Sequence, residues 1–249
     1  NEMVPWKIFR KPLEKVRKKH RKSNAGRKPF DVILMFKIMI LQSLYNLSDD
    51  QAEYQVRDRL SFMRFLGLSV GDTVPDAKTI WLFREQLKEA DVLQSLFKKF
   101  DRFLKNNGFA ARKGQIVDAS IVASPRQRNT RDENKKIKEG EVPEGWCENK
   151  KRQKDTDARS VKQNGENYYG YKNHVSVDVK YKFVRKFDVT DAAVHDINVF
   201  EDLLDKNNTS RDVWADSAYR SSEKLESLEK RRYREHIQRK GVQIGRAHV

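Results

Sequence analysis

The chain has 249 residues, which is enough for one large domain or two modest ones with their own hydrophobic cores. Its 52 Lys and Arg residues outnumber its 36 Asp and Glu residues, and the formal net charge of +16 favours a polyanionic partner such as nucleic acid. Cys147 is the single cysteine, which excludes an intrachain disulfide and a cysteine-based metal site.

A membrane partner is not expected. The longest apolar run, residues 32–44, is interrupted by Lys37 and Gln42 and is shorter than the ~20 residues that a membrane-spanning helix needs. No signal peptide precedes it, and a single cysteine fits a reducing compartment. We therefore predict a cytoplasmic protein that does not contact a membrane.

Residues 1–29 are basic and show no clear periodicity. Cations are crowded ahead of Pro29, at Lys15, Arg17, Lys18, Lys19, Arg21 and Lys22. We interpret the segment as an N-terminal arm, which is either solvated or grips the phosphates of a nucleic acid.

Apolar residues at helical spacing predict a helical domain over residues 30–108. The first helix is apolar almost all round, which predicts a position at the centre of a bundle. A second helix begins at the capping box of residues 48–51 and continues to Gly67. A third begins near Asp76, and a fourth runs from about Asp91 to Asn106.

Two short helices of this domain, joined by a Gly-containing turn, can form a DNA-binding helix-turn-helix. The residues available for its outer face are Lys78, Arg84, Gln86 and Lys88. A bundle that serves only for packing or dimerisation explains the same pattern, so both interpretations stay open.

An acidic residue, Asp118, lies inside residues 114–124, which otherwise have the composition of a β-strand. Ile116, Val117, Ile121 and Val122 fill both faces, a pattern typical of a central strand that is covered on both sides. A carboxylate in that setting is costly unless it is paired, hydrogen-bonded or bound to a cation.

A second short strand runs into Asp216, ahead of a Ser-rich helix start. Two strands that each end near a carboxylate suggest that Asp118 and Asp216 converge at one edge of a sheet. The alternative is that each Asp only caps a turn or a helix, and composition does not decide between the two.

Residues 126–165 are rich in Arg, Lys, Asn and Glu and almost lack large apolar residues, so we predict a long insertion loop without a core. Candidate nucleic-acid ligands here and in the following strand are Arg126, Arg128, Arg131, Lys150, Lys151, Arg152, Lys154 and Lys172. Because the first of these cations directly follow the Asp118 strand, we favour contact with a DNA backbone over a merely solvated loop.

Further along, residues 168–179 and 183–189 predict a β-hairpin. A helix follows from His195, then the Asp216 strand, a helix capped by residues 221–222 and a short strand at residues 234–238. With the Asp118 strand, this order indicates an α/β layer with a mixed sheet over residues 113–243.

The remaining candidate ligands are predicted to have structural roles. His174 and His195 have no second histidine at ligand spacing, which favours a strand-surface residue and a helix-start residue. Asp178, Asp188 and Asp191 surround the hairpin, where turn and edge roles are the default.

Four short motifs together resemble a known family. They are Ile-Val-Asp118-Ala-Ser-Ile-Val, Tyr-Tyr-Gly-Tyr-Lys-Asn-His174, Val-Thr-Asp-Ala-Ala-Val-His-Asp196 and Ala-Asp216-Ser-Ala-Tyr219. In this order, and with the helical stretch of residues 41–67, they resemble bacterial DDE transposases of the insertion sequence 5 family, in the insertion sequence 4-like superfamily. The resemblance covers nearly the whole chain.

The resemblance implies a ribonuclease-H-like catalytic domain in which two Asp and one Glu hold two divalent ions, Mg²⁺ or Mn²⁺. The first two acids correspond to Asp118 and Asp216. Two metals in such a site clamp the attacking and leaving oxygens of an in-line displacement at phosphorus. The implied partners are double-stranded DNA, namely terminal inverted repeats and target DNA, and a second copy of the chain, at the bacterial nucleoid.

The third acid of the family has no counterpart here. It lies on a helix beyond residues 233–238, and the acids Glu223, Glu226, Glu229 and Glu235 are too close behind Asp216 to correspond to it. Residues 244–249 match the translation of a sequencing adapter, so we exclude them from the fold. We therefore expect a fragment that is incomplete at both ends and inactive without the third ligand.

Two other functions stay open at this point. A non-catalytic DNA-binding protein is favoured by the missing Glu, and a ribonuclease-H-like nuclease would hydrolyse DNA without joining strands.

Overall fold

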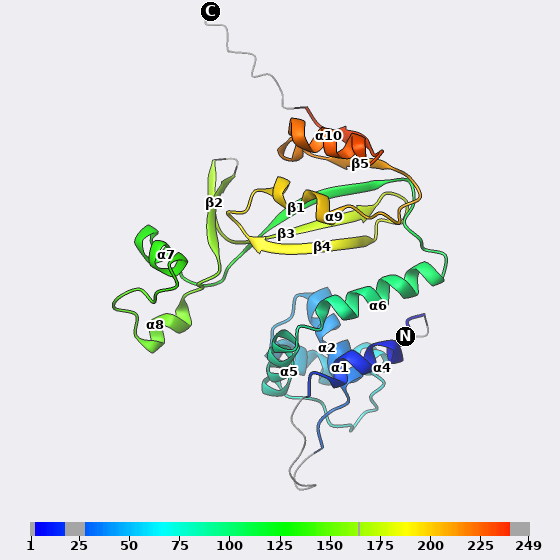
Figure 1. Ribbon diagram of the computed structural model, residues 1–249. Coiled ribbons are helices and arrows are strands. Elements are labelled where there is room, and N and C mark those ends of the chain that lie inside the picture. Colours follow the sequence, from blue (N-terminus) through cyan, green and yellow to red (C-terminus); the bar gives the residue numbers. More distant parts are fainter. Residues whose placement is uncertain (1–2, 18–27, 164, 240–249) are drawn as a thin grey trace, which may run out of the picture. The chain divides into compact units, whose positions relative to one another are not determined.

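The computed structural model describes residues 3–17, 28–163 and 165–239 (Figure 1). The chain forms two compact units, Asn1–Asn107 and Gly108–Val249, and each is described by itself. The expectations for Lys18, Lys19, Arg21, Lys22 and residues 244–249 lie outside the described residues.

The first unit is helical. Its elements are η1 (Trp6–Phe9), α1 (Arg10–Glu14), α2 (Val32–Tyr45), α3 (Asp49–Asp58), α4 (Leu60–Leu66), α5 (Ala77–Glu89) and α6 (Leu93–Asn106). The α2 helix contacts α1, α3, α4 and α5, which confirms its predicted central position. Among the described helices, none is both long and apolar enough to cross a bilayer alone, and α2 with α3 passes only as a pair bent by 103°.

Lys37 shows how the central helix accommodates a charge. The side chain is buried, its Nζ donates to the carbonyl of Phe65 at 3.0 Å, and the ammonium lies 5.0 Å from the centroid of the Trp6 ring. Burial lowers the pKa of Lys37. The apolar run of residues 32–44 therefore continues through Lys37 without a break in the core.

Side-chain caps define where the helices begin. Ser48 and Gln51 form the predicted capping box of α3, and Asp76 caps α5 by accepting a hydrogen bond from the backbone N–H of Thr79. The prediction of a single helix from residue 48 to Gly67 is wrong in one respect. Arg59 is extended (φ −98°, ψ 112°), so the segment forms two helices, α3 and α4. Leu60, which follows this break, is 69% exposed.

Of the two interpretations of the N-terminal arm, the solvated one is wrong for the described part of the segment. Phe9, Leu13 and Val16 are 3%, 0% and 6% exposed and belong to the core of the helical unit. The Phe9 ring contacts Phe36 and Phe100, with centroids 5.3 and 6.4 Å away. The many cations of this segment conceal a short amphipathic helix, because the apolar positions are few but all face the core.

The second unit is a mixed α/β layer. Its strands are β1 (Gln115–Ala123), β2 (Arg159–Gln163), β3 (Glu166–Asp178), β4 (Val184–Asp191), β5 (Asp212–Ala215) and β6 (Arg234–Ile237). In the sheet, β3 is antiparallel to β1, β2 and β4, whereas β5 is parallel to both β1 and β6. The predicted α/β class and mixed sheet are confirmed within the described part of this unit.

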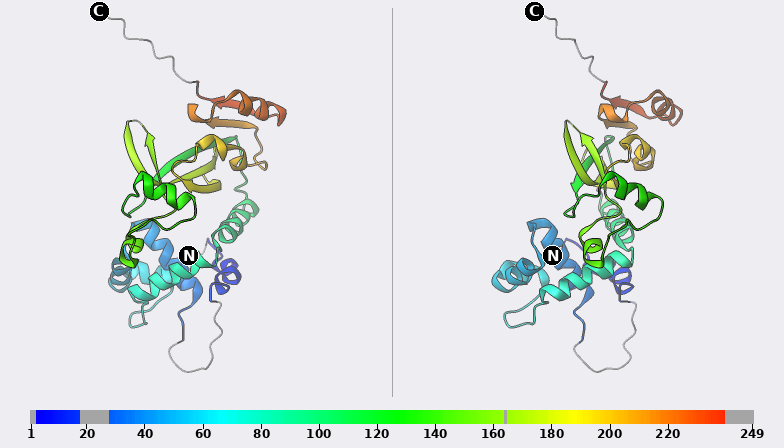
Figure 2. Two further views of the ribbon diagram at one scale, coloured as in Figure 1. Left: turned by 60° about the vertical axis from the view of Figure 1, so that its left-hand side comes forward. Right: turned by 90° about the vertical axis from the view of Figure 1, so that its left-hand side faces the viewer.

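Helical segments cover one face of this sheet. They are η2 (Asp196–Asn198), α9 (Phe200–Leu203), η3 (Ser217–Tyr219) and α10 (Ser222–Lys230). Phe200, Leu203 and Leu228 from these segments pack against Val117 and Val213 of the sheet. Figure 2 shows α7 (Arg131–Lys138) and α8 (Glu148–Gln153) beside β2, well apart from α10.

Candidate active site

The pairing register brings the two candidate carboxylates together. Val117 of β1 is opposite Ala215 of β5, and Asp118 and Asp216 are the next residues on the two parallel strands. Neighbouring strands lie roughly 4.8 Å apart, and residues in register project from the same face. Asp118 and Asp216 therefore stand side by side where the pairing of β1 with β5 ends.

Each carboxylate is fixed by one local hydrogen bond. Oδ1 of Asp118 accepts from the backbone N–H of Ala119 at 2.8 Å, and Oδ1 of Asp216 accepts from the N–H of Ala218 at 2.9 Å. Within the described residues, the second oxygen of each carboxylate makes no hydrogen bond. Asp216 thus caps η3, as expected from the alternative that each Asp caps a turn or a helix. One oxygen of each acid nevertheless remains available to a ligand.

The prediction that Asp118 lies in a strand covered on both sides is wrong. Asp118 is exposed, and Val122 is 50% exposed on the same face of β1. In the part of the chain that the structure describes, α9 and α10 cover the opposite face, where Val117 is buried. Because Asp118 is solvated, no desolvation cost has to be offset by a partner.

Tyr219 follows Asp216 by three residues, in η3, and no role was predicted for it from the sequence. It is 1% exposed, its ring packs on Phe200 with centroids 5.2 Å apart, and its hydroxyl has no hydrogen-bond partner among the described residues. Burial raises the pKa of Tyr219, and the charges of Asp196, Asp118 and Asp216 raise it further. The phenol is therefore protonated at neutral pH.

Lys172, predicted to bind nucleic acid, is instead held inside the second unit. Its Nζ donates to Oδ1 of Asp196 and to the carbonyl of Val194, both at 2.8 Å, and the residue is 8% exposed. This arrangement leaves the ammonium little access to a phosphate. The ion pair fixes Asp196 at η2, which packs against η3 and Tyr219.

His174 is a core residue and not the strand-surface residue that was predicted. It is 0% exposed, and its Nε2 is 2.9 Å from Oγ1 of Thr190. Burial lowers the pKa of His174, so the ring is neutral at pH 7. His195 has the predicted helix-start role, because its Nδ1 accepts from the N–H of Ile197.

The rival carboxylates have the predicted turn and edge roles. Asp178 is fully buried, pairs with Arg185 and accepts from the N–H of Tyr181 in the β3–β4 hairpin turn. Asp188 and Asp191 accept hydrogen bonds from backbone N–H groups close by in the chain. None of the three lies at the site of Asp118 and Asp216 in the register of the sheet.

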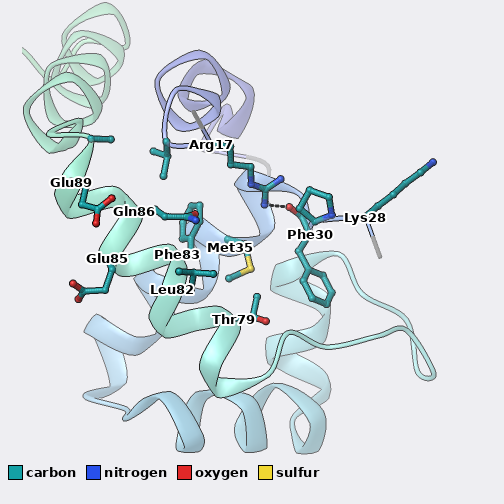
Figure 3. A pocket seen from close by; sticks show the side chains of 13 residues that line it. Arg17, Lys28, Phe30, Met35, Thr79, Leu82, Phe83, Glu85, Gln86 and Glu89 are labelled. Carbon is teal, nitrogen blue, oxygen red and sulfur yellow. Dashed lines mark hydrogen bonds between the residues drawn. The ribbon is translucent and has the colours of Figure 1, made fainter. Parts of the chain in front are cut away.

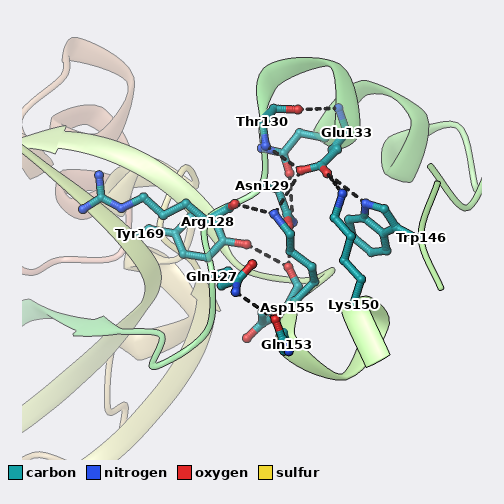
Figure 4. A network of polar contacts seen from close by, with 12 residues as sticks. Gln127, Arg128, Asn129, Thr130, Glu133, Trp146, Lys150, Gln153, Asp155 and Tyr169 are labelled. Carbon is teal, nitrogen blue, oxygen red and sulfur yellow. Dashed lines mark hydrogen bonds and ion pairs between the residues drawn. The ribbon is translucent and has the colours of Figure 1, made fainter. Parts of the chain in front are cut away.

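Residues 126–165 form a small folded insertion, so the predicted loop without a core is wrong. Figure 4 shows its centre, where Glu133 accepts from Nε1 of Trp146 at 2.8 Å. Nζ of Lys154 also donates to Glu133, at 3.1 Å. Burial alone would raise the pKa of Glu133, but hydrogen bonds from Thr130, Trp146 and Lys154 outweigh it and lower the pKa to about 2. Trp146 is 8% exposed.

Asp155 fastens the insertion to the sheet. Its carboxylate accepts from the hydroxyls of Tyr171 at 2.8 Å and Ser124 at 3.1 Å, and its carbonyl accepts from the hydroxyl of Tyr169 at 2.8 Å. Burial would raise the pKa of Asp155, but its hydrogen bonds, led by that of Tyr171, lower it. The insertion is therefore tied to β1 and β3 just beyond the Asp118 strand segment.

The candidate DNA-binding cations differ in their surroundings. Lys151 pairs with Glu148 at 2.9 Å, and Lys150 lies 3.4 Å from Glu133. Arg126 and Arg128 donate to backbone carbonyls of Arg152 and Asn167, and Lys154 is buried. Arg131 and Arg152 are exposed on α7 and α8, which makes them the best placed of the set to meet a phosphate.

In the helical unit, Lys78 and Lys88 of the predicted outer face are exposed on α5, but Arg84 is not free for DNA. Arg84 of α5 is bound to Asp49 and Gln42, and ten residues, 67–76, separate α4 from α5, whereas a helix-turn-helix has a turn of about three or four. A tight turn does join α2 to α3 at 103°, but α3 begins with Asp49 and Asp50, which repel phosphate.

A pocket of about 710 Å³ lies in the helical unit, lined by α5 on one side and by residues 16, 17 and 28–30 on the other. Figure 3 shows Arg17 donating to the carbonyl of Phe30 on one side, with Glu85 and Glu89 of α5 on the other. Acidic and basic side chains both line it, so its charge does not favour a nucleic acid.

Comparison with known proteins gives two family matches. Residues 1–86 match the family described as "Transposase domain (DUF772)", and residues 110–246 match the family described as "Transposase DDE domain". Among solved structures, the chain is similar to a piggyBac transposase in a synaptic complex with hairpin DNA, with 15% identity and a TM-score of 0.46. That alignment covers 99% of this chain and 49% of the other, so the chain spans about half the length of that structure.

Proposed function

This chain belongs to the transposase DDE domain family, and we propose that it acts on DNA as a transposase whose metal ligands include Asp118 and Asp216. The observation that carries the proposal is the register of β1 and β5, which sets the two carboxylates side by side. We further propose that the protein is of the bacterial insertion sequence 5 type and acts on the nucleoid.

The donor set suits a hard divalent cation. Two adjacent carboxylates with one unbonded oxygen each fit Mg²⁺ or Mn²⁺, which commonly take one or two protein carboxylates and complete their shell with water and substrate phosphates. Two such ions, once bound, would polarise the phosphoryl oxygens and lower the pKa of an attacking water. Asp118 and Asp216 would hold and orient them, with Oδ1 of each acid anchored to the backbone.

The proposed substrate is double-stranded DNA with terminal inverted repeats, joined to target DNA by a homodimer. The chain carries a formal charge of +16, and the folded insertion, which is tied to Ser124 just after β1, presents Arg131 and Arg152. A backbone contact there would align a DNA end with the carboxylates without reading its sequence.

A cleavage assay tests the proposal. Asp118→Asn and Asp216→Asn should each reduce nicking of a labelled DNA end in Mg²⁺ or Mn²⁺ by about 10³-fold or more, and the double variant should lose little beyond either single variant, because the acids act as a unit. Asp188→Asn is the matched control, since Asp188 only accepts a hydrogen bond from Val189. Full activity in either site variant would refute the assignment.

A second candidate is DNA binding without cleavage. One observation favours it: among the described residues, no group of three His, Cys, Asp or Glu side chains is arranged to hold a metal ion. If this candidate is right, the chain binds DNA equally well in EDTA and yields no cut product. A nuclease, in contrast, would cut in Mg²⁺ but give no strand-transfer product with a precut end.

A further inference from the structure

Asn173 lies on the same face of the sheet as Asp118. In the antiparallel pairing of β1 with β3, Asn173 is opposite Ser120, two residues beyond Asp118. Side chains alternate between the two faces of a strand, so Asp118, Ser120 and Asn173 project from one face, which we call the open face. Val117 is buried on the opposite face, under the helices, and so is His174.

Packing does not explain the presence of Asn173 in the motif that ends at His174. Its neighbour Lys172 is buried with a bound ammonium, and Tyr171 holds the insertion through its hydroxyl. The side chain of Asn173 is only half-buried, and among the described residues its amide makes no hydrogen bond. Both the donor and the acceptor of this amide are therefore available to a ligand.

Asparagine is also an unfavourable residue for this strand. At Asn173, β3 is paired on both sides, with β1 and β4, and Asn is among the residues that are depleted in strands. Two of its neighbours on the open face are apolar, Val175 in the same strand and Val189 opposite it in β4. Local rules of strand stability are broken mainly at functional sites, which favours a functional role for the amide.

The position of the amide favours a phosphate as its ligand. Residues two apart on a strand are about 7 Å apart, so Ser120 lies about that far from Asp118. Asn173 is a diagonal neighbour of Asp118, at roughly 7–8 Å. In the described sheet, the pairing of β1 with β5 ends before Asp118, which leaves Ser120 exposed. Asn and Ser side chains commonly bind the phosphate oxygens of DNA, and a strand brought to the two carboxylates passes within their reach.

We propose that the amide of Asn173 and the hydroxyl of Ser120 bind a phosphate of the DNA strand on which Asp118 and Asp216 act. This inference rests on the proposed function, which supplies the substrate strand. The two side chains contact the DNA and not the metal, so they contribute to DNA affinity and leave the affinity for a divalent ion unchanged. Because both are uncharged, they release no counterions, and their contribution does not depend on salt.

The test is the affinity of the whole chain for a labelled DNA end, measured by fluorescence anisotropy in Ca²⁺, which has the charge of Mg²⁺. Asn173→Val should weaken binding by about 10-fold or more, because a hydrogen bond to a charged phosphate is lost. The slope of the logarithm of affinity against that of salt concentration should stay the same. The melting temperature should equal or exceed that of the unsubstituted chain, since Val suits a strand better. Mn²⁺ binding without DNA, followed by calorimetry, should not change.

Ser120 offers a matched pair of variants. Ser120→Thr keeps the hydroxyl and should bind the DNA end as the unsubstituted chain does, whereas Ser120→Val has nearly the same shape without the hydroxyl and should bind more weakly. Asn198→Ala is the control for the loss of an amide. Asn198 is exposed at the end of η2, on the helix-covered side of the sheet, so its replacement should leave DNA affinity unchanged.

The outcomes separate this inference from the proposed function. If Asn173→Val binds the DNA end as tightly as the unsubstituted chain, or Ser120→Val as tightly as Ser120→Thr, the inference is wrong. It is also wrong if Asn173→Val lowers the melting temperature together with the affinity, because a structural role then explains both. In these cases the proposed function stands as long as the unsubstituted chain cuts DNA and Asp118→Asn does not. If the unsubstituted chain fails to cut, or Asp118→Asn cuts as fast, the proposed function and this inference both fail.

Discussion

Gly114 sets the position from which β1 runs beside β5. Its φ of +88° is a conformation that side chains with a Cβ rarely adopt, and an added Cβ would lie 2.4 Å from the Trp214 ring and 2.6 Å from the carbonyl of Asp212. The side chain of Asn208 holds this glycine through both its N–H and its carbonyl, at 3.0 and 2.6 Å. The register that pairs Asp118 with Asp216 begins one residue later, so it depends on this close approach.

Gly114→Ala should therefore destabilise the second unit by about 2–4 kcal/mol, as the sum of a left-handed conformation and overpacking against Trp214. Gly108→Ala is the control, because Gly108 has a similar φ of +85° but nothing within 4 Å of the added Cβ, and it should cost only about 1 kcal/mol. Chemical denaturation of both variants measures the difference. Equal losses would mean that the contact with Trp214 has no energetic consequence.

Some residue-level features could be predicted and others could not. Asp118 and Asp216 stood out because a carboxylate interrupts or follows an apolar strand, and that signal is local. Tyr219 gave no such signal, because its burial depends on Phe200 and on a sheet formed by distant segments. Lys172 was predicted to be at the DNA surface because the sequence does not show that Asp196, 24 positions later, lies within 2.8 Å of it.

At the scale of elements, the insertion is organised around a charge and not around apolar side chains. Glu133 accepts hydrogen bonds from Thr130, Trp146 and Lys154, and Lys150 adds a nearby charge, so the polar groups of α7 and α8 satisfy one another (Figure 4). Such a network is favourable only while the carboxylate is ionised, because its partners are all donors. The fold of the insertion should then depend on pH.

The direction of that dependence follows from the pKa of Glu133. Its folded value of about 2 lies below the ordinary value of 4.5, so the stabilisation is complete above about pH 4.5 and is lost as the pH falls towards 2. The indole N–H resonance of Trp146 should shift over this interval in NMR spectra. Glu133→Gln can still accept from Trp146 but not titrate, so its resonance should stay constant. An identical shift in this variant would show that another group controls the insertion.

Elements differed in how far the sequence could predict them. The β3–β4 hairpin was predicted from the alternation at Val175 and Val177, which has the period of a strand. The face that is buried was not predictable from it, because the buried positions of β3 are Lys172, His174, Ser176 and Asp178, and the two valines are only half-buried. The insertion helices were missed because composition suggested a loop, although Thr130 and Glu133 have the spacing of a capping box. A core made of hydrogen bonds leaves no hydrophobic periodicity to detect.

For the whole molecule, two independent observations indicate DNA as the partner: the paired carboxylates and the positive net charge. The sheet brings together Asp118 and Asp216, which are almost a hundred residues apart in the sequence, and the insertion between them in the chain carries exposed cations. The class of the fold was predictable because each element has its own pattern. The order of the strands in the sheet was not predictable from the sequence, because β1 pairs with β3 and β5, which are distant from it in the chain.

The last prediction concerns the salt dependence of DNA binding. A partner recognised through phosphates releases counterions, so the logarithm of the affinity falls with the logarithm of salt concentration by about 0.9 for each phosphate neutralised. With a net charge of +16, the chain should lose affinity by at least about 10³-fold between 50 and 200 mM salt, the change expected for six or more phosphate contacts. Fluorescence anisotropy with a labelled duplex measures this slope.

The insertion should account for a definite part of that slope. Replacing Arg131 and Arg152 by Gln removes two exposed cations, so the slope should fall by about two if both meet phosphates. Lys230→Gln is the matched control, because Lys230 is 79% exposed on α10, away from the insertion, and the slope should not change. An equal decrease in both variants would indicate diffuse attraction to the whole basic surface. An affinity that is insensitive to salt would exclude binding through phosphates altogether.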